Sequence, residues 1–398
     1  MIIRELRMFT RNRVAMMVFF GAPILFGLIV GFVYQKADVS KLPVCVVDLD
    51  NTQLSQKIID AINDNEYIDV VMIKDDQAQA QKLFKHGKVD AVITIPENFS
   101  GEIQQKRYPE IQLDLNTLNI LTANYITRGV SASLQTINAG IEIETLQKKG
   151  MTFNVASTQF ESFKLNIDRY FNPMANYLQF LWPGVICTIF QQVVLLVMAL
   201  VFSKEFESRT FNTLLHYSNN AFVLILIKVI PYLVLSTCLW FGIVYGMFPF
   251  FKIPIHANIF TMILFSMVFI ISVLFFGIMA SVIFPTQLMS TEVLMIIATP
   301  SFIISGFTWP MSQMPGFIKI IANTIPLTHY VDGFRRLAYM DATLTDVFPQ
   351  IIAMLIIAIV TAFVAWIVLR YKILAYRSNH KLIKTVLNAK RLRKVTGK

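Results

Sequence analysis

Long apolar stretches alternate with shorter polar segments along this chain. A helix of about 20 apolar residues crosses the roughly 30 Å hydrocarbon core of a membrane. Stretches of this kind run from Val14 to Tyr34, Ala175 to Phe202, Phe222 to Phe248, Ile259 to Phe284, Leu288 to Phe307 and Val347 to Leu369. The pattern predicts a polytopic α-helical membrane protein with six transmembrane helices.

The segment between the first two apolar stretches, residues 35–174, follows a different pattern. Short β-rich runs such as Val44 to Val47 and Ala91 to Ile95 alternate with apolar residues at helical spacing. The stretch from Leu118 to Gln147 then reads as one long helix. We expect an inserted α/β domain in which this helix stands against a small mixed sheet.

Composition and charge agree with this organisation. The chain has 398 residues, of which 55% are hydrophobic and 15% are charged, which is more apolar than a typical soluble domain. Arg4, Arg7, Arg11 and Arg13 precede the first stretch, and 10 of the 35 basic residues follow Leu369. Because cytoplasmic segments carry excess Lys and Arg, both termini are predicted to be cytoplasmic.

This orientation divides the chain into four parts. Residues 1–34 form a basic interfacial helix and the first span, and residues 35–174 form the domain outside the cytoplasm. That domain carries 18 acidic and 14 basic residues, the opposite bias from the two ends. Residues 175–370 hold the other five spans, and residues 371–398 form a basic cytoplasmic tail.

The start of the inserted domain invites an enzymatic interpretation. Asp48 and Asp50 follow a hydrophobic run in an Asp-x-Asp-x-Thr pattern that resembles the nucleophile loop of haloacid-dehalogenase-type phosphatases. Such chemistry also needs a lysine and a later acidic pair around magnesium. Lys74 and the two carboxylates after it come in an implausible order. We therefore expect Asp50, Asn51 or Thr52 to cap the next helix.

Two connecting segments of the membrane half carry polar or helix-breaking residues. In residues 203–218, Glu205, Glu207 and Arg209 alternate with apolar residues, which predicts a short amphipathic helix at the cytoplasmic face. In residues 305–328, a glycine and three prolines interrupt an apolar stretch. Because broken backbone at membrane depth needs protein or a water-filled cavity around it, we expect an outer re-entrant turn.

Two charged side chains fall close to or inside predicted spans. Glu292 is predicted inside the fifth span, where an ionisable group marks a pathway or a buried pair, or reaches the interface by snorkelling. Lys228, in the third span, is expected at the membrane interface. No segment matches GxxxxGK[ST], so any ATP is expected to be hydrolysed by another chain.

Four groups of residues resemble permeases of type-2 ATP-binding-cassette exporters, in the subgroup with a large domain after the first helix. The groups are Arg169 to Pro173 with Phe180, Pro183 and Gly184; Lys204 to Thr210 with Leu214 and Leu215; Lys228, Pro231 and Tyr232; and Pro300, Ser305 to Phe307, Pro310, Met314, Pro315, Ile325 to Thr328 and Arg335. In the third group Ile227 replaces the family's glycine. The resemblance covers nearly the whole chain.

The resemblance implies an exporter permease of the bacterial inner membrane that binds no cofactor itself. Its expected partners are cytoplasmic subunits that carry ATP and Mg²⁺, a second copy or a similar permease, and a periplasmic adaptor (membrane-fusion) protein. Its expected substrate is a drug-like or amphiphilic small molecule. The alternative is a membrane-anchored receptor or binding protein of the same architecture without transport.

The resemblance also assigns roles to particular residues. Coupling to the ATPase is implied for Glu205, Glu207, Arg209, Thr210 and Leu214. Together with Glu292, the outer segment supplies candidates for the translocation path, namely Ser305, Gly306, Phe307 and Pro310.

Overall fold

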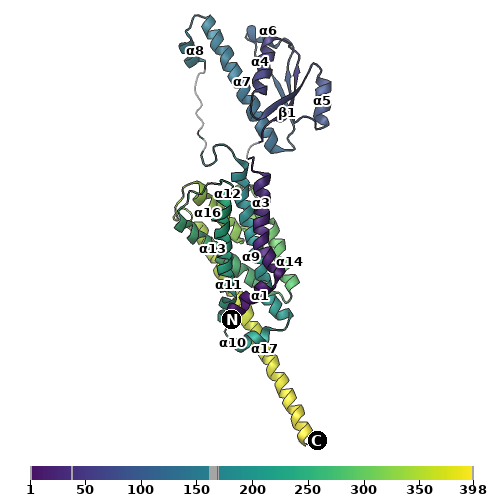
Figure 1. Cartoon of the computed structure of the whole chain (residues 1–398), viewed down its shortest axis with the longest axis vertical. Coiled ribbons are helices and arrows are strands. Elements are labelled where there is room, and N and C mark those ends of the chain that lie inside the picture. The colour runs from purple at the N-terminus through teal and green to yellow at the C-terminus, as the bar shows by residue number, and fades with distance from the viewer. Residues whose placement is uncertain (1, 37–38, 161–167, 169, 397–398) are drawn as a thin grey trace. The chain divides into compact units, whose positions relative to one another are not determined.

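The computed structural model describes residues 2–36, 39–160, 168 and 170–396, with side chains up to Arg377. The chain folds into two compact units, one made of Met1–Gln35 with Tyr170–Lys398 and the other of Lys36–Arg169 (Figure 1). The predicted insertion of a separate domain into a membrane unit is therefore present.

Among the described residues of the membrane unit, six helical segments are long and apolar enough to span a membrane. Their bounds are Arg13–Val33, Tyr177–Glu207, Ala221–Phe250, Ile259–Ile283, Gln287–Ile304 and Phe348–Arg377. Each overlaps one predicted stretch, so the predicted class of polytopic helical membrane protein is confirmed. The elements in them are α2 (Arg13–Met16), η1 (Met17–Gly21), α3 (Ala22–Val33), α9 (Tyr177–Glu207), α11 (Ala221–Gly242), η2 (Ile243–Met247), α12 (Phe248–Phe250), α13 (Ile259–Ile283), α14 (Gln287–Ile304) and α17 (Phe348–Thr396).

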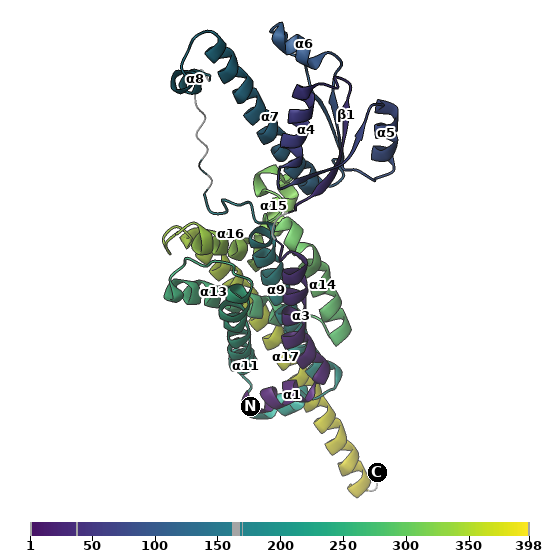
Figure 2. The same cartoon turned by 45° about the horizontal axis from the view of Figure 1, so that its top comes forward.

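The two ends of the membrane unit differ. Figure 2 shows α1 (Ile2–Arg11) lying across the end from which α17 projects, and α10 (Phe211–Tyr217) lies at the same end in Figure 1. Helix α17 runs past the predicted boundary between span and tail at residue 370 and continues as one helix to Thr396.

The segment after α14 contains breaks at the predicted helix breakers. Gly306 has φ +84°, a backbone conformation that favours glycine. Pro310 and Pro315 precede the short helices η3 (Met311–Gln313) and α15 (Gly316–Asn323), and Pro326 begins α16 (Pro326–Tyr339). Helix α16 was not predicted; its Tyr330 is buried and stacks on Phe269 with ring centroids 3.9 Å apart.

The inserted domain contains the predicted mixed sheet. Its strands are β1 (Leu42–Asp48), β2 (Ile68–Lys74), β3 (Ala91–Ile95) and β4 (Gln112–Leu115). They lie in the order β2-β1-β3-β4; β1 pairs in parallel with β2 and β3, and β4 is antiparallel to β3.

Helices lie on both faces of this sheet, and one further helix packs on another helix. The helices are α4 (Gln53–Asn63), α5 (Gln77–Lys85), α6 (Phe99–Gln104) and α7 (Ile120–Lys148), together with α8 (Phe153–Gln159), which packs against α7. Residues of α4 and α7, such as Ile58 and Ile126, share one buried cluster with Val44 and Val46 of β1. The long helix therefore packs on the sheet as predicted, whereas the short helices α6 and α8 were not foreseen.

Candidate functional site

A group of buried charges joins three helices at the end of the bundle where α1 lies. The Lys228 Nζ on α11 lies 2.8 Å from Glu5 Oε2 on α1 and 3.0 Å from Glu205 Oε1 on α9. The exposed fractions of these side chains are 0% for Lys228, 3% for Glu5 and 0% for Glu205. Two carboxylates therefore surround the Lys228 ammonium group inside the protein, whereas its expected depth at the membrane interface stays a prediction.

Two further side chains complete this group. The Arg4 guanidinium lies 3.1 Å from Glu205 Oε1 and 3.5 Å from Glu5 Oε1, and the Thr210 hydroxyl donates to Glu205 Oε2. We call Arg4, Glu5, Glu205, Thr210 and Lys228 the ion cluster. Its two cations balance its two anions. Because an unpaired buried charge is costly, the three buried charges Glu5, Glu205 and Lys228 depend on one another for their place in the interior.

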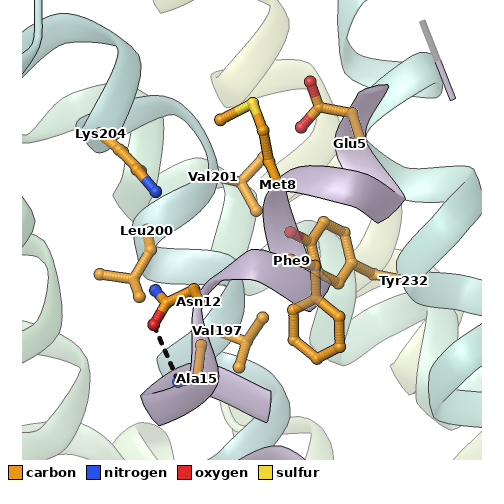
Figure 3. Close-up of a pocket in the computed structure, with 10 residues that line it drawn as sticks. All are labelled: Glu5, Met8, Phe9, Asn12, Ala15, Val197, Leu200, Val201, Lys204 and Tyr232. Atoms are coloured by element: carbon orange, nitrogen blue, oxygen red, sulfur yellow. Dashed lines mark hydrogen bonds between the residues drawn. The ribbon is translucent and has the colours of Figure 1, made fainter. Parts of the chain in front are cut away.

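The sequence of α1 explains how Glu5 enters the interior. Glu5 and Phe9 are one helical turn apart, so they lie on the same face, and both are buried. Phe9 makes edge contacts with Phe19 and Tyr232. A small cavity of about 30 Å³ lies beside these residues, with Asn12 at its edge capping the next helix (Figure 3).

The segment from 203 to 218 is only partly the amphipathic helix that was predicted. Helix α9 runs on to Glu207, and α10 begins at Phe211 after a turn in which Arg209 has φ +57°. We call residues 203–218 the coupling segment. Its apolar face packs inside this chain, because Phe211 and Leu214 are buried.

The residues implied in coupling therefore fall into two groups. Glu205 and Leu214 are buried within this chain, Glu205 in the ion cluster and Leu214 in the bundle core, so their predicted part in coupling involves no exposed side chain. Glu207, Arg209 and Thr210 are exposed. Of these, Thr210 also reaches inward through its hydrogen bond to Glu205.

Glu207 connects the coupling segment to another spanning helix. Its Oε2 accepts hydrogen bonds from the backbone N–H and the side-chain amide of Gln287, both at 3.0 Å. Gln287 is the first residue of α14, where backbone N–H groups have no partner within the helix. These two hydrogen bonds therefore join the coupling segment to the start of α14.

Helix α14 presents Glu292 on its exposed side. Glu292 lies on one stripe with Leu288 and Ile296, which are 68% and 73% exposed within this single chain. The opposite side of α14 is buried against α9, where Gln191 Nε2 lies 3.4 Å from Ser301 Oγ. The carboxylate thus lies on the side of α14 that this chain leaves uncovered.

At the other end of the bundle, residues of two sequence motifs meet. The Arg335 guanidinium lies 4.2 Å from the ring centroid of Phe307 and donates to the Phe307 carbonyl oxygen at 3.1 Å. Phe307 stacks on Phe180, and a Cβ on Gly184 would come within 2.4 Å of its ring. We call Phe180, Gly184, Phe307 and Arg335 the outer clamp, because together they fix the turn that Ser305 and Gly306 begin.

The rest of the outer segment is held by a buried amide. Gln191 on α9 is 1% exposed, and its Oε1 accepts the backbone N–H of Leu327 at the start of α16. Ser305 is buried, whereas Pro310 is exposed at the beginning of η3. This contact was not predicted, because a glutamine in an apolar span has no local pattern that reveals its partner.

The Asp48 and Asp50 pair stabilises a helix start. Asp48 accepts hydrogen bonds from two backbone N–H groups and from Ser55 Oγ, and Thr52 caps α4. Partial burial opposes ionisation of Asp50, but hydrogen bonds from Thr52 and Ser100 hold its pKa below the ordinary value. The predicted cap is confirmed at Thr52, and both carboxylates are occupied as acceptors.

The described residues thus form six candidate spanning helices, an inserted domain and a charged connection between two spans, an arrangement compatible with a membrane permease. A model of the ABC-2 family of transporter proteins matches residues 14–367, and the chain belongs to this family. It is an ABC transporter permease, a class that is normally non-catalytic, and membership implies association with ATP-binding subunits and dimerisation. Arg169, part of the first motif, lies outside the described residues.

Relatives of similar length share modest sequence identity with this chain. A probable multidrug ABC transporter permease of Escherichia coli K12, YbhS, is 23% identical over 337 residues, covering 84% of this chain and 86% of the relative. A second one, YbhR, is 23% identical over 365 residues, covering 88% and 92%. The inner membrane transport permease YhhJ of the same organism is 22% identical, covering 85% and 89%.

Proposed function

We propose that this permease exports a drug-like or amphiphilic small molecule, driven by ATP that separate cytoplasmic subunits hydrolyse. The carrying observation is the ion cluster, which fixes the coupling segment to α1 and α11 through Glu205, Glu5 and Lys228. A segment that connects two spans is ordinarily mobile. In this proposal the ion pairs hold the coupling segment to the helical bundle, so that movement of the ATPase subunit is passed on to the spans.

In this proposal the exposed side of the coupling segment contacts the ATP-binding subunit. Glu207 and Arg209 lie on that side, next to the buried anchor formed by Phe211 and Leu214. Movement of the ATPase pushes on the segment, and the bonds between Glu207 and Gln287 carry the displacement to α14. Because the ion cluster joins the coupling segment to α1 and α11, the segment cannot be displaced unless these helices move with it.

The exposed side of α14 is proposed to border the translocation path in a dimer. A carboxylate in an apolar span marks a pathway or a buried pair. Glu292 has no hydrogen bond or ion pair with the other described residues of this chain, which supports a position facing water or a second permease. At the opposite end, the outer clamp with Ser305, Gly306 and Pro310 closes the path.

The direction and the partners follow from charge and from likeness. Arginines before the first span and lysines after the last support cytoplasmic termini. With this orientation the inserted domain lies outside the cytoplasm. We propose that it is a docking surface for an adaptor protein. The names of YbhS and YbhR mention multidrug transport, which supports the substrate class. The absence of a GxxxxGK[ST] match in the sequence supports hydrolysis by another chain.

Co-expression with a candidate ATP-binding subunit tests this function. The purified complex is reconstituted in vesicles, and accumulation of a cationic amphiphilic dye is followed after ATP is added to the side of the coupling segment. The proposal expects dye movement away from that side, together with dye-stimulated ATP hydrolysis. Co-purification without any ATP-dependent movement of dyes, lipids or other amphiphiles would favour a receptor that has lost transport.

A further inference from the structure

The inserted domain has an edge strand that is unusually apolar. Strand β2 lies at one end of the sheet order, and no other described strand pairs with its outer side. Val71, Met72 and Ile73 on it are 43%, 38% and 50% exposed. Natural proteins normally cover or charge such edges, because exposed N–H and C=O groups there accept a further strand. This edge is therefore available for pairing.

A hollow with a cationic lining runs beside this strand. It lies between β2 and α5 and has a volume of about 440 Å³. Met72 and Leu83 supply apolar surface, and the ionisable groups that line it are Lys74, Lys82, His86 and Lys88. A partner that carries negative charge complements this lining.

The strand register of β2 shows whether a small ligand or an extended chain would cover its exposed side chains. Met72 pairs with Cys45, which packs with α5, and Ile73 pairs with Val46, which packs with α4 and α7. Exposed apolar side chains thus occur on both faces of the edge. A small anion in the hollow would cover one face, whereas an extended chain along β2 covers both.

We propose that β2 receives an extra strand from an acidic, extended segment of a partner protein. Main-chain hydrogen bonds along the edge would supply affinity, as in other strand-addition complexes. Alternate side chains of the added strand point to the same face, so one set of acidic groups meets Lys74, Lys82 and Lys88. Asn63 Oδ1 already accepts the backbone N–H of Val70, so the added strand pairs beyond that residue.

This inference rests on the proposed role of the inserted domain as a docking surface, and it is independent of the direction of transport. It names the part of the domain that binds and the chemistry of the partner. Binding of a peptide to this edge needs no ATPase and no substrate, so its failure leaves the transport test unaffected.

A fluorescent synthetic peptide in which Glu and Val alternate tests the inference. The full chain is placed in nanodiscs of zwitterionic lipid, and peptide binding is followed by fluorescence anisotropy. We expect saturable binding that weakens about tenfold or more when Lys74→Glu and Lys82→Glu are combined, or when alternate peptide nitrogens are methylated. Lys57→Glu is the control for charge reversal outside the hollow. Lys57 is exposed on α4, a helix that packs on the opposite face of the sheet from α5.

Each other outcome contradicts the proposal. Absence of binding overturns it, as does binding that N-methylation leaves unchanged, because strand addition requires those N–H groups. If a Lys and Val peptide binds equally well, the charge argument is wrong. If Lys57→Glu weakens binding as much as the paired substitution, the peptide responds to net charge rather than to this edge.

Discussion

Lys228 shows how much a single residue depends on groups far away in sequence. Its neighbours in the chain are apolar, so local pattern places it at the membrane interface. Its ammonium group is instead paired with Glu5 and Glu205, which lie 223 and 23 residues away. No periodicity in the sequence relates these three positions. By contrast, Thr52 was predictable, because a helix cap is determined by residues within one turn.

Replacement of Lys228 tests the ion cluster directly. Lys228→Met leaves two buried carboxylates with only the partly exposed Arg4 as a cation, and loss of one partner of a buried pair typically costs about 3 to 5 kcal/mol. We expect a clear fall in the thermal unfolding midpoint of the detergent-purified protein. Lys204→Met is the matched control, since Lys204 lies close by on α9 and is partly exposed. Equal stability of the two variants would contradict the assigned role.

Substitutions at Asp48 distinguish a structural role of this carboxylate from a catalytic one. Asp48→Ala removes the acceptor of three hydrogen bonds, which we expect to lower stability of the domain by about 1 to 3 kcal/mol. Limited proteolysis of the full chain checks this, with the exposed Asp60→Ala as control.

The wild-type protein should hydrolyse no phosphomonoester in magnesium. Turnover that Asp48→Asn abolishes would restore the phosphatase interpretation.

At the scale of elements, the spans and the α/β alternation were predictable because each has a strong local period. The helix breakers of the outer segment were also predictable: Pro310 and Pro315 directly precede η3 and α15, and Pro326 begins α16. Helix α16 was missed because its buried face combines aromatic and small residues among charged ones. Its place depends on stacking of Tyr330 with Phe269, a contact between distant segments.

The outer clamp predicts a difference between adjacent arginines. Arg335 packs on Phe307 and bonds its carbonyl oxygen, whereas Arg336 makes an exposed pair with Asp332. A charge-assisted hydrogen bond is typically worth about 1.5 to 3 kcal/mol, and an exposed pair is worth about 1 kcal/mol or less. Arg335→Ala should therefore speed hydrogen exchange from residues 305 to 315, and Arg336→Ala should not. Equal exchange in both variants would refute the clamp.

At the scale of the whole molecule, charge distribution predicts the orientation of both units. Gln104 in the inserted domain and Asn219 between α10 and α11 are exposed, so a cysteine at either position is accessible to reagents. In a Cys238→Ser background, an impermeant thiol reagent added to intact cells should label Gln104→Cys and leave Asn219→Cys unlabelled. Labelling of Asn219→Cys in intact cells would reverse the assigned direction.

In the coupling segment, a single residue, Glu207, connects helix α14 to the proposed movement of the whole transporter. Glu207 bonds the first residue of α14, and it is exposed on the side proposed to contact the ATPase. Glu207→Gln keeps an oxygen acceptor for the N–H of Gln287 but loses the charge. Glu207→Ala loses both. The two variants thus distinguish a link to α14 from an ionic contact with the ATPase.

The most direct measurement is substrate-stimulated ATP hydrolysis, recorded together with export in the reconstituted complex of permease and ATPase. Glu207→Ala should lower both by about tenfold or more, because a charge-assisted contact at an interface typically contributes about 2 kcal/mol or more. Glu142→Ala, an exposed glutamate on α7, should behave as the wild type. Full coupled transport and full ATPase association in Glu207→Ala would contradict the account.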